Sequence, residues 1–125
     1  MQFRLKTSKQ TAEIFNSINQ REHIQPFALA KIAIMLAIKE GYKAGDKIVP
    51  NDTDGLELNR QTITGENDDL FKALIEVNEG EYLEEDIYFP YYIKSYLDYG
   101  AFLLEQEVKY SRNIYSHLVN LEKGI

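Results

Sequence analysis

The chain has 125 residues, of which 44% are hydrophobic, and a formal net charge of −6. This length predicts one hydrophobic core and a single domain. The chain contains no cysteine, which excludes disulfides, thiolate metal sites, iron–sulfur clusters and a cysteine nucleophile within it. The N-terminus lacks the apolar region of a signal peptide, and the apolar run at residues 27–38 is too short to span a membrane. We therefore expect a soluble, cytoplasmic protein.

The charges are distributed unevenly along the chain. Residues 1–47 carry eight Lys/Arg against four acidic residues, whereas residues 48–125 carry six against sixteen. Screening at physiological salt acts over roughly 8 Å, so local potential rather than net charge decides whether a surface attracts phosphate. The N-terminal third can therefore contact nucleic acid, unless the asymmetry reflects only ordinary surface solvation.

The first seven residues alternate between apolar and polar side chains, with Gln2, Arg4 and Lys6 on the polar side. A period of two predicts a half-buried β-strand. Thr7 and Gln10 then resemble a capping box, and apolar residues recur at helical spacing, which predicts a helix over residues 8–21.

A second helix is expected over residues 26–40, with Pro26 in its first turn, where a missing N–H costs nothing. This helix is apolar on nearly every face, so other helices or a second subunit must cover it. We interpret it as the centre of the core, in one chain or in a dimer.

Downstream, residues 56–63 alternate and predict a short strand or an extended arm, and residues 67–78 carry a helical stripe. Residues 78–86 are predicted to form an acidic loop, and Pro90 to open a long fourth helix. The fold class is therefore mainly α. The predicted organisation of the single domain 1–125 is a ribbon-helix-helix-like unit (1–41), a loop or short strand (42–66) and a helical region (67–125).

A strand, a helix, a tight connection and an apolar helix form the layout of the ribbon-helix-helix unit. In that fold, strands from two chains pair and enter the major groove of DNA. Arginine and glutamine can read base edges there, whereas lysines can hold phosphates. An edge strand with solvated charges is the alternative. The predicted DNA-binding residues are Gln2, Arg4, Lys6, Lys9 and Arg21.

Three segments, residues 24–34, 54–66 and 70–74, resemble the DndE family, the small subunits of the bacterial Dnd DNA phosphorothioation system. The resemblance covers about residues 1–108 and leaves the tail, residues 109–125, without a counterpart. The motif positions that it includes are Pro26, Lys31, Asn59, Arg60, Thr62, Gly65 and Glu66.

The resemblance implies a non-catalytic accessory protein that binds double-stranded DNA without a cofactor and forms homo-oligomers. Its partners would be the sulfurtransferase-like and ATPase-like Dnd proteins that replace a non-bridging phosphate oxygen by sulfur. The absence of cysteine agrees with this division of labour, since a thiol carrier or cluster would need one. A stand-alone ribbon-helix-helix repressor or antitoxin, and a scaffold that works through its acidic region, are the alternatives.

Individual residues also have alternative interpretations. Lys31 either extends its charged end to water or pairs with Glu57 or Glu66. Arg60 is either a phosphate contact or a partner of the acidic run at residues 79–86. Gly65 is expected to adopt a positive φ.

No metal site is expected from the sequence. The two histidines, His23 and His117, are interpreted as surface or cap residues. The run at residues 52–57 lacks the ligand spacing of a calcium loop, and nothing in the carboxylate spacing requires Mg²⁺. The tyrosines around Pro90 are expected to pack in the core or at a subunit contact rather than to stack on bases.

Overall fold

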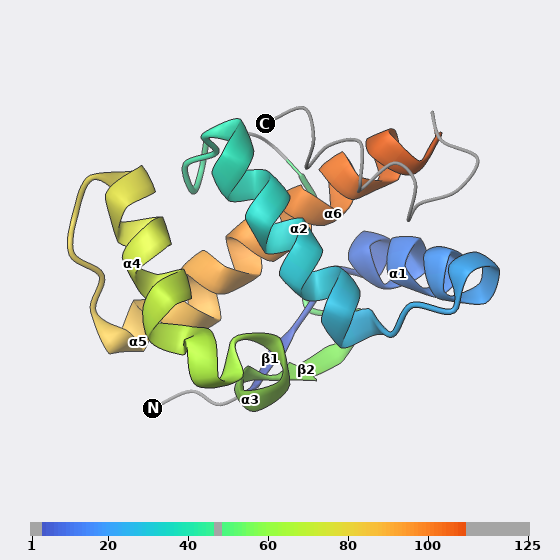
Figure 1. The fold of residues 1–125 in the computed structure, drawn as a ribbon, viewed down its shortest axis with the longest axis horizontal. Coiled ribbons are helices and arrows are strands. Elements are labelled where there is room, and N and C mark those ends of the chain that lie inside the picture. The colour runs from blue at the N-terminus through green and yellow to red at the C-terminus, as the bar shows by residue number, and fades with distance from the viewer. Residues whose placement is uncertain (1–3, 47–48, 110–125) are drawn as a thin grey trace.

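The computed structural model describes residues 4–46 and 49–109 and is mainly helical, as the sequence predicts, with a small two-stranded sheet (Figure 1). The elements in chain order are β1 (Arg4–Lys6), α1 (Lys9–Glu22), α2 (Pro26–Glu40), β2 (Glu57–Asn59), α3 (Arg60–Ile63), η1 (Gly65–Asn67), α4 (Asp68–Glu79), α5 (Glu85–Ile87), η2 (Tyr88–Ile93) and α6 (Lys94–Lys109). Among them η1 is a 3₁₀-helix and η2 is a π-helix.

Helix α1 begins after Ser8, one residue later than the predicted capping box. The Ser8 hydroxyl accepts a hydrogen bond from the Thr11 N–H at 3.0 Å. Thr7 is unavailable as the cap, because its hydroxyl accepts a hydrogen bond from the N–H of Leu56 at 2.9 Å. A contact 49 residues away in sequence therefore decides where the helix starts.

Helix α2 has the predicted bounds and lies at the centre of the core, where it crosses in front of α6 in Figure 1. Five of its residues are buried: Leu29, Ala30, Ala33, Ile34 and Ala37. Gly100 of α6 lies directly against the backbone of Ala33, so that an added Cβ would overlap the Ala33 carbonyl. Neighbouring helices thus cover much of α2, although Phe27 and Met35 remain 44% and 45% exposed.

The sheet pairs β1 with β2 of the same chain in antiparallel register, with Leu5 opposite Leu58. Both leucines are buried. The ribbon-helix-helix layout predicts that the first strand pairs with its counterpart in a second chain, and the observed pairing differs from that. The alternating segment downstream was expected to stay extended to residue 63, but the strand ends at Asn59, which caps α3.

Helix α4 lies within one residue of its predicted bounds, whereas the next segment differs from the prediction. Pro90 does not open the last long helix but lies inside η2, which α5 precedes and α6 continues. Proline lacks the N–H that an α-helical ladder needs, and the wider π-turn accommodates that interruption. The predicted continuation through residues 110–125, with His117, lies outside the described residues.

No helix among the described residues is long and apolar enough to cross a membrane.

Candidate nucleic-acid interface

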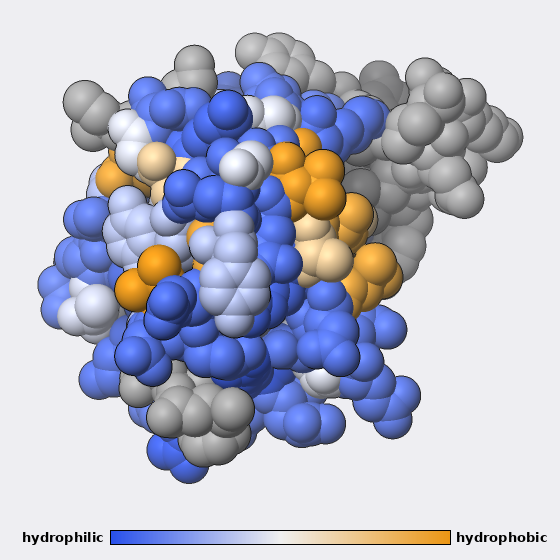
Figure 2. Space-filling view, turned by 90° about the vertical axis from the view of Figure 1, so that its left-hand side faces the viewer, coloured by the Kyte–Doolittle hydropathy of each residue, from blue (hydrophilic) through white to orange (hydrophobic). Residues whose placement is uncertain are grey.

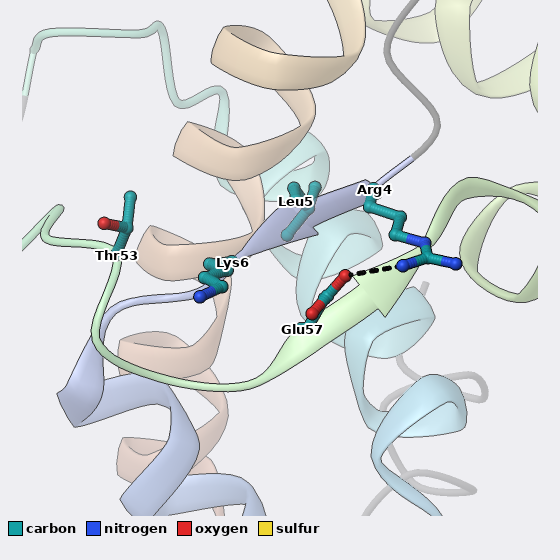
Figure 3. A pocket seen from close by; sticks show the side chains of 5 residues that line it. All are labelled: Arg4, Leu5, Lys6, Thr53 and Glu57. Atoms are coloured by element: carbon teal, nitrogen blue, oxygen red, sulfur yellow. Dashed lines mark hydrogen bonds and ion pairs between the residues drawn. The ribbon is translucent and has the colours of Figure 1, made fainter.

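The outer face of β1 carries two of the predicted DNA-binding side chains. Arg4 and Lys6 are exposed, while Leu5 between them is buried, because successive side chains of a strand point to opposite faces. Together with Thr53 and Glu57 they line a hollow of about 360 Å³ (Figure 3). The alternation of the sequence therefore places both cations on one solvent-facing surface.

Glu57 of β2 lies between the two cations in Figure 3. It is opposite Lys6 in the sheet register, and its Oε1 lies 3.2 Å from Arg4 Nη1. The side chains of Arg4 and Glu57 are 69% and 48% exposed. Such an exposed pair is worth roughly 0–1 kcal/mol, so a phosphate can compete with Glu57 for Arg4 at little cost.

Lys9 is exposed at the start of α1, three residues beyond Lys6. Its backbone N–H donates to Asp52 Oδ2 at 2.9 Å, and this hydrogen bond holds the pKa of Asp52 below its usual value. The helix N-terminus is thus already engaged by a carboxylate. Only the side chain of Lys9 is then a candidate phosphate contact.

A buried hydrogen-bond network lies beneath the basic surface of β1 and the start of α1 and holds these two elements in place. Asp98 of α6 accepts hydrogen bonds from the Ser8 N–H at 3.1 Å and from the Thr11 hydroxyl at 2.7 Å. Its other oxygen lies 2.6 Å from Lys94 Nζ, which also donates to the carbonyl of Asp52 at 2.9 Å. Helix α6 therefore fixes the junction between β1 and α1, a role that the sequence analysis missed. The only sequence signal for it is the i,i+4 spacing of Lys94 and Asp98.

Arg21 lies at the other end of α1, about 18 Å along the helix axis from Lys9. It lines a separate hollow of about 200 Å³ with Glu105 and Lys109. The structure thus brings Arg4 and Lys6 together, with Lys9 next along the chain, but does not add Arg21 to them. The predicted contact Gln2 lies outside the described residues.

Arg60 is buried in a network of ion pairs, which we call the Arg60 corner, and is not exposed as a cation that could contact a phosphate. It is 8% exposed, and its Nη2 lies 2.6 Å from Asp68 and 3.1 Å from Glu85. Its guanidinium also packs over the rings of Tyr88 and Phe89. The interpretation of Arg60 as a partner of the acidic run is therefore confirmed.

Asp68 is the second residue on which the contacts of the Arg60 corner converge. Burial raises the pKa of Asp68, but hydrogen bonds from Arg60 and Thr64 outweigh this effect and hold its pKa below the usual value. The Tyr88 hydroxyl donates to the same residue, and burial raises the pKa of Tyr88. These contacts tie α3, α4 and η2 together.

The remaining motif residues shape the backbone around this corner. The Asn59 side chain accepts from the Gln61 N–H at 2.8 Å, and the Thr62 hydroxyl donates to the Asn59 carbonyl at 2.9 Å. Gly65 has a φ of +50°, as predicted, and Glu66 is exposed. The segment most characteristic of the family resemblance is thus a capped turn.

In α2, Pro26 occupies the first turn as predicted. Lys31 is exposed, with Nζ 5.7 Å from the centre of the Phe27 ring. None of the described contacts joins it to Glu57 or Glu66, so the ion-pair alternative is wrong. The exposed side chain agrees with the other alternative, in which the charged end of Lys31 extends to water.

The other residues singled out in the sequence are mostly structural. Among the tyrosines around Pro90, the expected core packing is confirmed for Tyr88, Tyr96 and Tyr99, which are buried, but not for Tyr91, which is 51% exposed. His23 is exposed and ends α1 in a left-handed conformation with φ +58°, as expected of a cap residue. Within residues 4–46 and 49–109, no three His, Asp or Glu side chains are grouped to hold a metal ion.

Comparison with known proteins agrees with this arrangement. The family model described as DNA sulphur modification protein DndE matches residues 4–112. The crystal structure of DndE from Escherichia coli B7A, described as involved in DNA phosphorothioation modification, has a similar fold, with a TM-score of 0.64 at 16% identity. The match covers 83% of this chain and 97% of that one. No curated protein sequence matches. Because the family model matches most of its length, the chain belongs to the DndE family of DNA sulphur modification proteins.

Proposed function

We propose that the chain is a DNA-binding accessory subunit of the phosphorothioate modification system, one domain over residues 1–125, without catalytic activity of its own. It would act in the cytoplasm on double-stranded DNA together with the sulfurtransferase-like and ATPase-like Dnd proteins. Family membership supports the role in sulfur modification. DNA binding rests on the basic surface of β1 and the start of α1.

One observation carries the DNA-binding proposal. Arg4 and Lys6 project from one face of β1, and the Asp98 network holds that strand and α1 in place behind them. Cations on a rigid support lose less freedom when they bind a phosphate than cations on a loose segment. Arg4 and Lys6 are therefore the primary contacts, and Lys9 extends the surface.

The buried ionisable groups support a non-catalytic role. Asp98 is bound to Lys94, and Arg60 is bound to Asp68 and Glu85. Each of these groups has a partner that accounts for its burial. Structural roles therefore explain them without any catalytic function.

Self-association is the second part of the proposal. Phe27 and Met35 lie two turns apart on the outer face of α2 and are nearly half exposed. Burying them between subunits would remove apolar surface from water. Light scattering after size-exclusion chromatography tests this, with Met35→Glu expected to lower the subunit number.

An electrophoretic mobility shift assay with a double-stranded probe tests the DNA role. The double variant Arg4→Ala/Lys6→Ala should bind about tenfold or more weakly at low salt, since two phosphate contacts are lost. The matched control Lys39→Ala/Lys43→Ala removes the same charge from two exposed positions, one in the last turn of α2 and one just beyond its end. Equal losses in both variants would show that only the total charge matters and would contradict the proposed surface.

A further inference from the structure

Helix α4 has two apolar faces, of which only one contributes to the core. The inward face carries Phe71, which is 8% exposed, and Ile75, which is fully buried. The outward face carries Leu70 at 57% exposure and Val77 at 82%. Ala73 and Leu74 lie between them along the helix, exposed and partly exposed respectively. We call these four residues, Leu70, Ala73, Leu74 and Val77, the α4 ridge.

The spacing of the ridge is that of a helix-packing surface. Positions i, i+3, i+4 and i+7 form one stripe on an α-helix, the pattern by which a helix buries an apolar side. Single exposed apolar side chains are common and need no explanation, but a continuous row marks a contact. Figure 2 views the molecule from the side of α4 and α5 and shows hydrophobic patches within a largely hydrophilic surface. No described segment covers Leu70 or Val77.

The surroundings of the ridge are strongly acidic. Residues 65–91 contain nine Asp and Glu residues and a single basic residue, Lys72. Lys72 is already 3.4 Å from Glu85. Glu66 and Asp69 are exposed next to the ridge and have no ion pair among the described residues. An occupant of the ridge must therefore bring apolar side chains together with positive charge.

We propose that the α4 ridge docks an amphipathic helix of another protein of the sulfur-modification system, whose apolar stripe is flanked by lysine or arginine. This inference rests on the proposed role as an accessory subunit. The apolar stripes supply burial, and the cations meet Glu66 and Asp69, which fixes the partner and its orientation.

A second copy of this chain fits the ridge less well. A two-fold contact of α4 with α4 places the same patch on both sides, so the acidic residues of the two copies would face each other. Like charges in such a contact oppose association. A head-to-tail contact of the ridge with the outer face of α2, which carries Phe27, Lys31 and Met35, avoids this repulsion and is distinguished by the experiment below.

The ridge is separate from the basic surface. In Figure 1, α4 lies on the left, whereas β1 lies at the lower centre and α1 on the right. The acidic side repels DNA while the basic side attracts it. One subunit can therefore hold DNA on one face and a partner protein on the other.

The experiment co-expresses the affinity-tagged full-length chain with the other Dnd proteins and measures how much of each is captured. The variant Leu70→Asp/Val77→Asp should reduce capture at least about tenfold, because apolar anchor residues dominate such interfaces. The charge variant Glu66→Lys/Asp69→Lys should reduce capture as well. Ile87→Asp/Tyr91→Asp is the matched control, since it introduces the same charge at exposed apolar positions outside α4 and should leave capture unchanged.

Circular dichroism, light scattering and the DNA mobility shift of each variant complete the test. Unchanged helicity, subunit number and DNA affinity in the ridge variant, with capture lost, support the docking site. Undiminished capture by the ridge variant, or no capture by the wild type, overturns it. A fall in the subunit number of the isolated ridge variant also overturns it, because the occupant is then a second copy. If the wild type captures the other Dnd proteins but does not bind DNA, the DNA-binding proposal is refuted and the docking site still stands.

Discussion

Two ion pairs of the same i,i+4 spacing in α6 lie in opposite environments. Lys94 and Asp98 are 2.6 Å apart with side chains 13% and 1% exposed, whereas Lys109 and Glu105 are 3.9 Å apart with side chains 59% and 36% exposed. Removing one partner of a buried pair leaves an uncompensated charge, but an exposed pair is already solvated. Burial rather than spacing decides what each pair contributes.

We expect Asp98→Asn to lower the free energy of unfolding by about 3–5 kcal/mol, because Lys94 loses its buried counter-charge. The control Glu105→Gln in the same helix should cost less than about 1 kcal/mol. Urea denaturation monitored by circular dichroism measures both. Similar losses for the two variants would show that Asp98 does not hold the junction between β1 and α1.

The second residue-scale prediction concerns Glu57, which lies between Arg4 and Lys6. Glu57→Gln removes a negative charge from the basic surface and breaks only an exposed pair. We expect several-fold tighter binding of double-stranded DNA at low salt, with the free energy of unfolding changed by no more than about 1 kcal/mol. Fluorescence anisotropy of a labelled duplex measures the affinity. Unchanged or weaker binding would place the phosphate contacts elsewhere.

At the scale of elements, the crossing of α2 and α6 depends on a close backbone approach. Gly100 lies against the Ala33 backbone, and a Cβ at position 100 would overlap it. Alanine is the better helix former by about 1 kcal/mol, yet overpacking a tight contact costs about 1–3 kcal/mol. The two helices can separate only by disturbing the core around them.

Gly100→Ala should therefore destabilise the fold by about 2 kcal/mol, because a clash with backbone atoms puts the overpacking cost near its upper end of about 3 kcal/mol, against a gain of about 1 kcal/mol in helix propensity. Thermal unfolding followed by circular dichroism checks the sign. An unchanged or higher midpoint would mean that α2 and α6 are not in close contact at this position.

The long helices could be predicted from sequence because each has a continuous local pattern. Helix α2 matches its predicted bounds, and α4 lies within one residue of them. The ends that differ depend on distant contacts: Thr7 accepts from Leu56, and β1 pairs with β2 more than 50 residues away in sequence. No window of local sequence contains those partners, so neither the cap of α1 nor the pairing of β1 could be read from it.

The candidate site was predictable to a similar degree. Alternation in the first strand was enough to place Arg4 and Lys6 on one face. The buried support of Asp98 and Lys94 was missed, because it joins residues about 90 positions apart in the chain. Arg21 was predicted as a DNA contact with the others, although the helix predicted over residues 8–21 already separates it from Lys9.

For the whole molecule, the carboxylates with lowered pKa predict loss of stability in acid. Asp68 and Asp52 both have a pKa below the ordinary value of 3.8, so their contribution is complete above that value and is lost as the pH falls through the folded-state pKa. The thermal midpoint should therefore fall as the pH drops below about 4. The Asp68→Asn variant should have a lower thermal midpoint at neutral pH than the wild type, and its midpoint should fall less on acidification. An equal acid dependence in that variant would exclude Asp68 as a cause.

The molecule as a whole separates a basic face at β1 and the start of α1 from an acidic face at α4 and α5. The described basic face presents Arg4, Lys6 and Lys9, whereas residues 65–91 carry nine acids against one lysine. A net negative protein can bind DNA only if it presents such a local surface to the phosphates. The N-terminal strand is therefore central to the proposed function.

The most direct test is the salt dependence of double-stranded DNA binding by the wild type and by Arg4→Ala/Lys6→Ala, measured on two duplexes of unrelated sequence. Each phosphate contact contributes about 0.9 to the slope of log affinity against log salt concentration. We expect the double variant to bind both duplexes more weakly, with a slope smaller by about 1–2. An unchanged slope and affinity, or no binding by the wild type at low salt, would contradict DNA binding through the N-terminal strand.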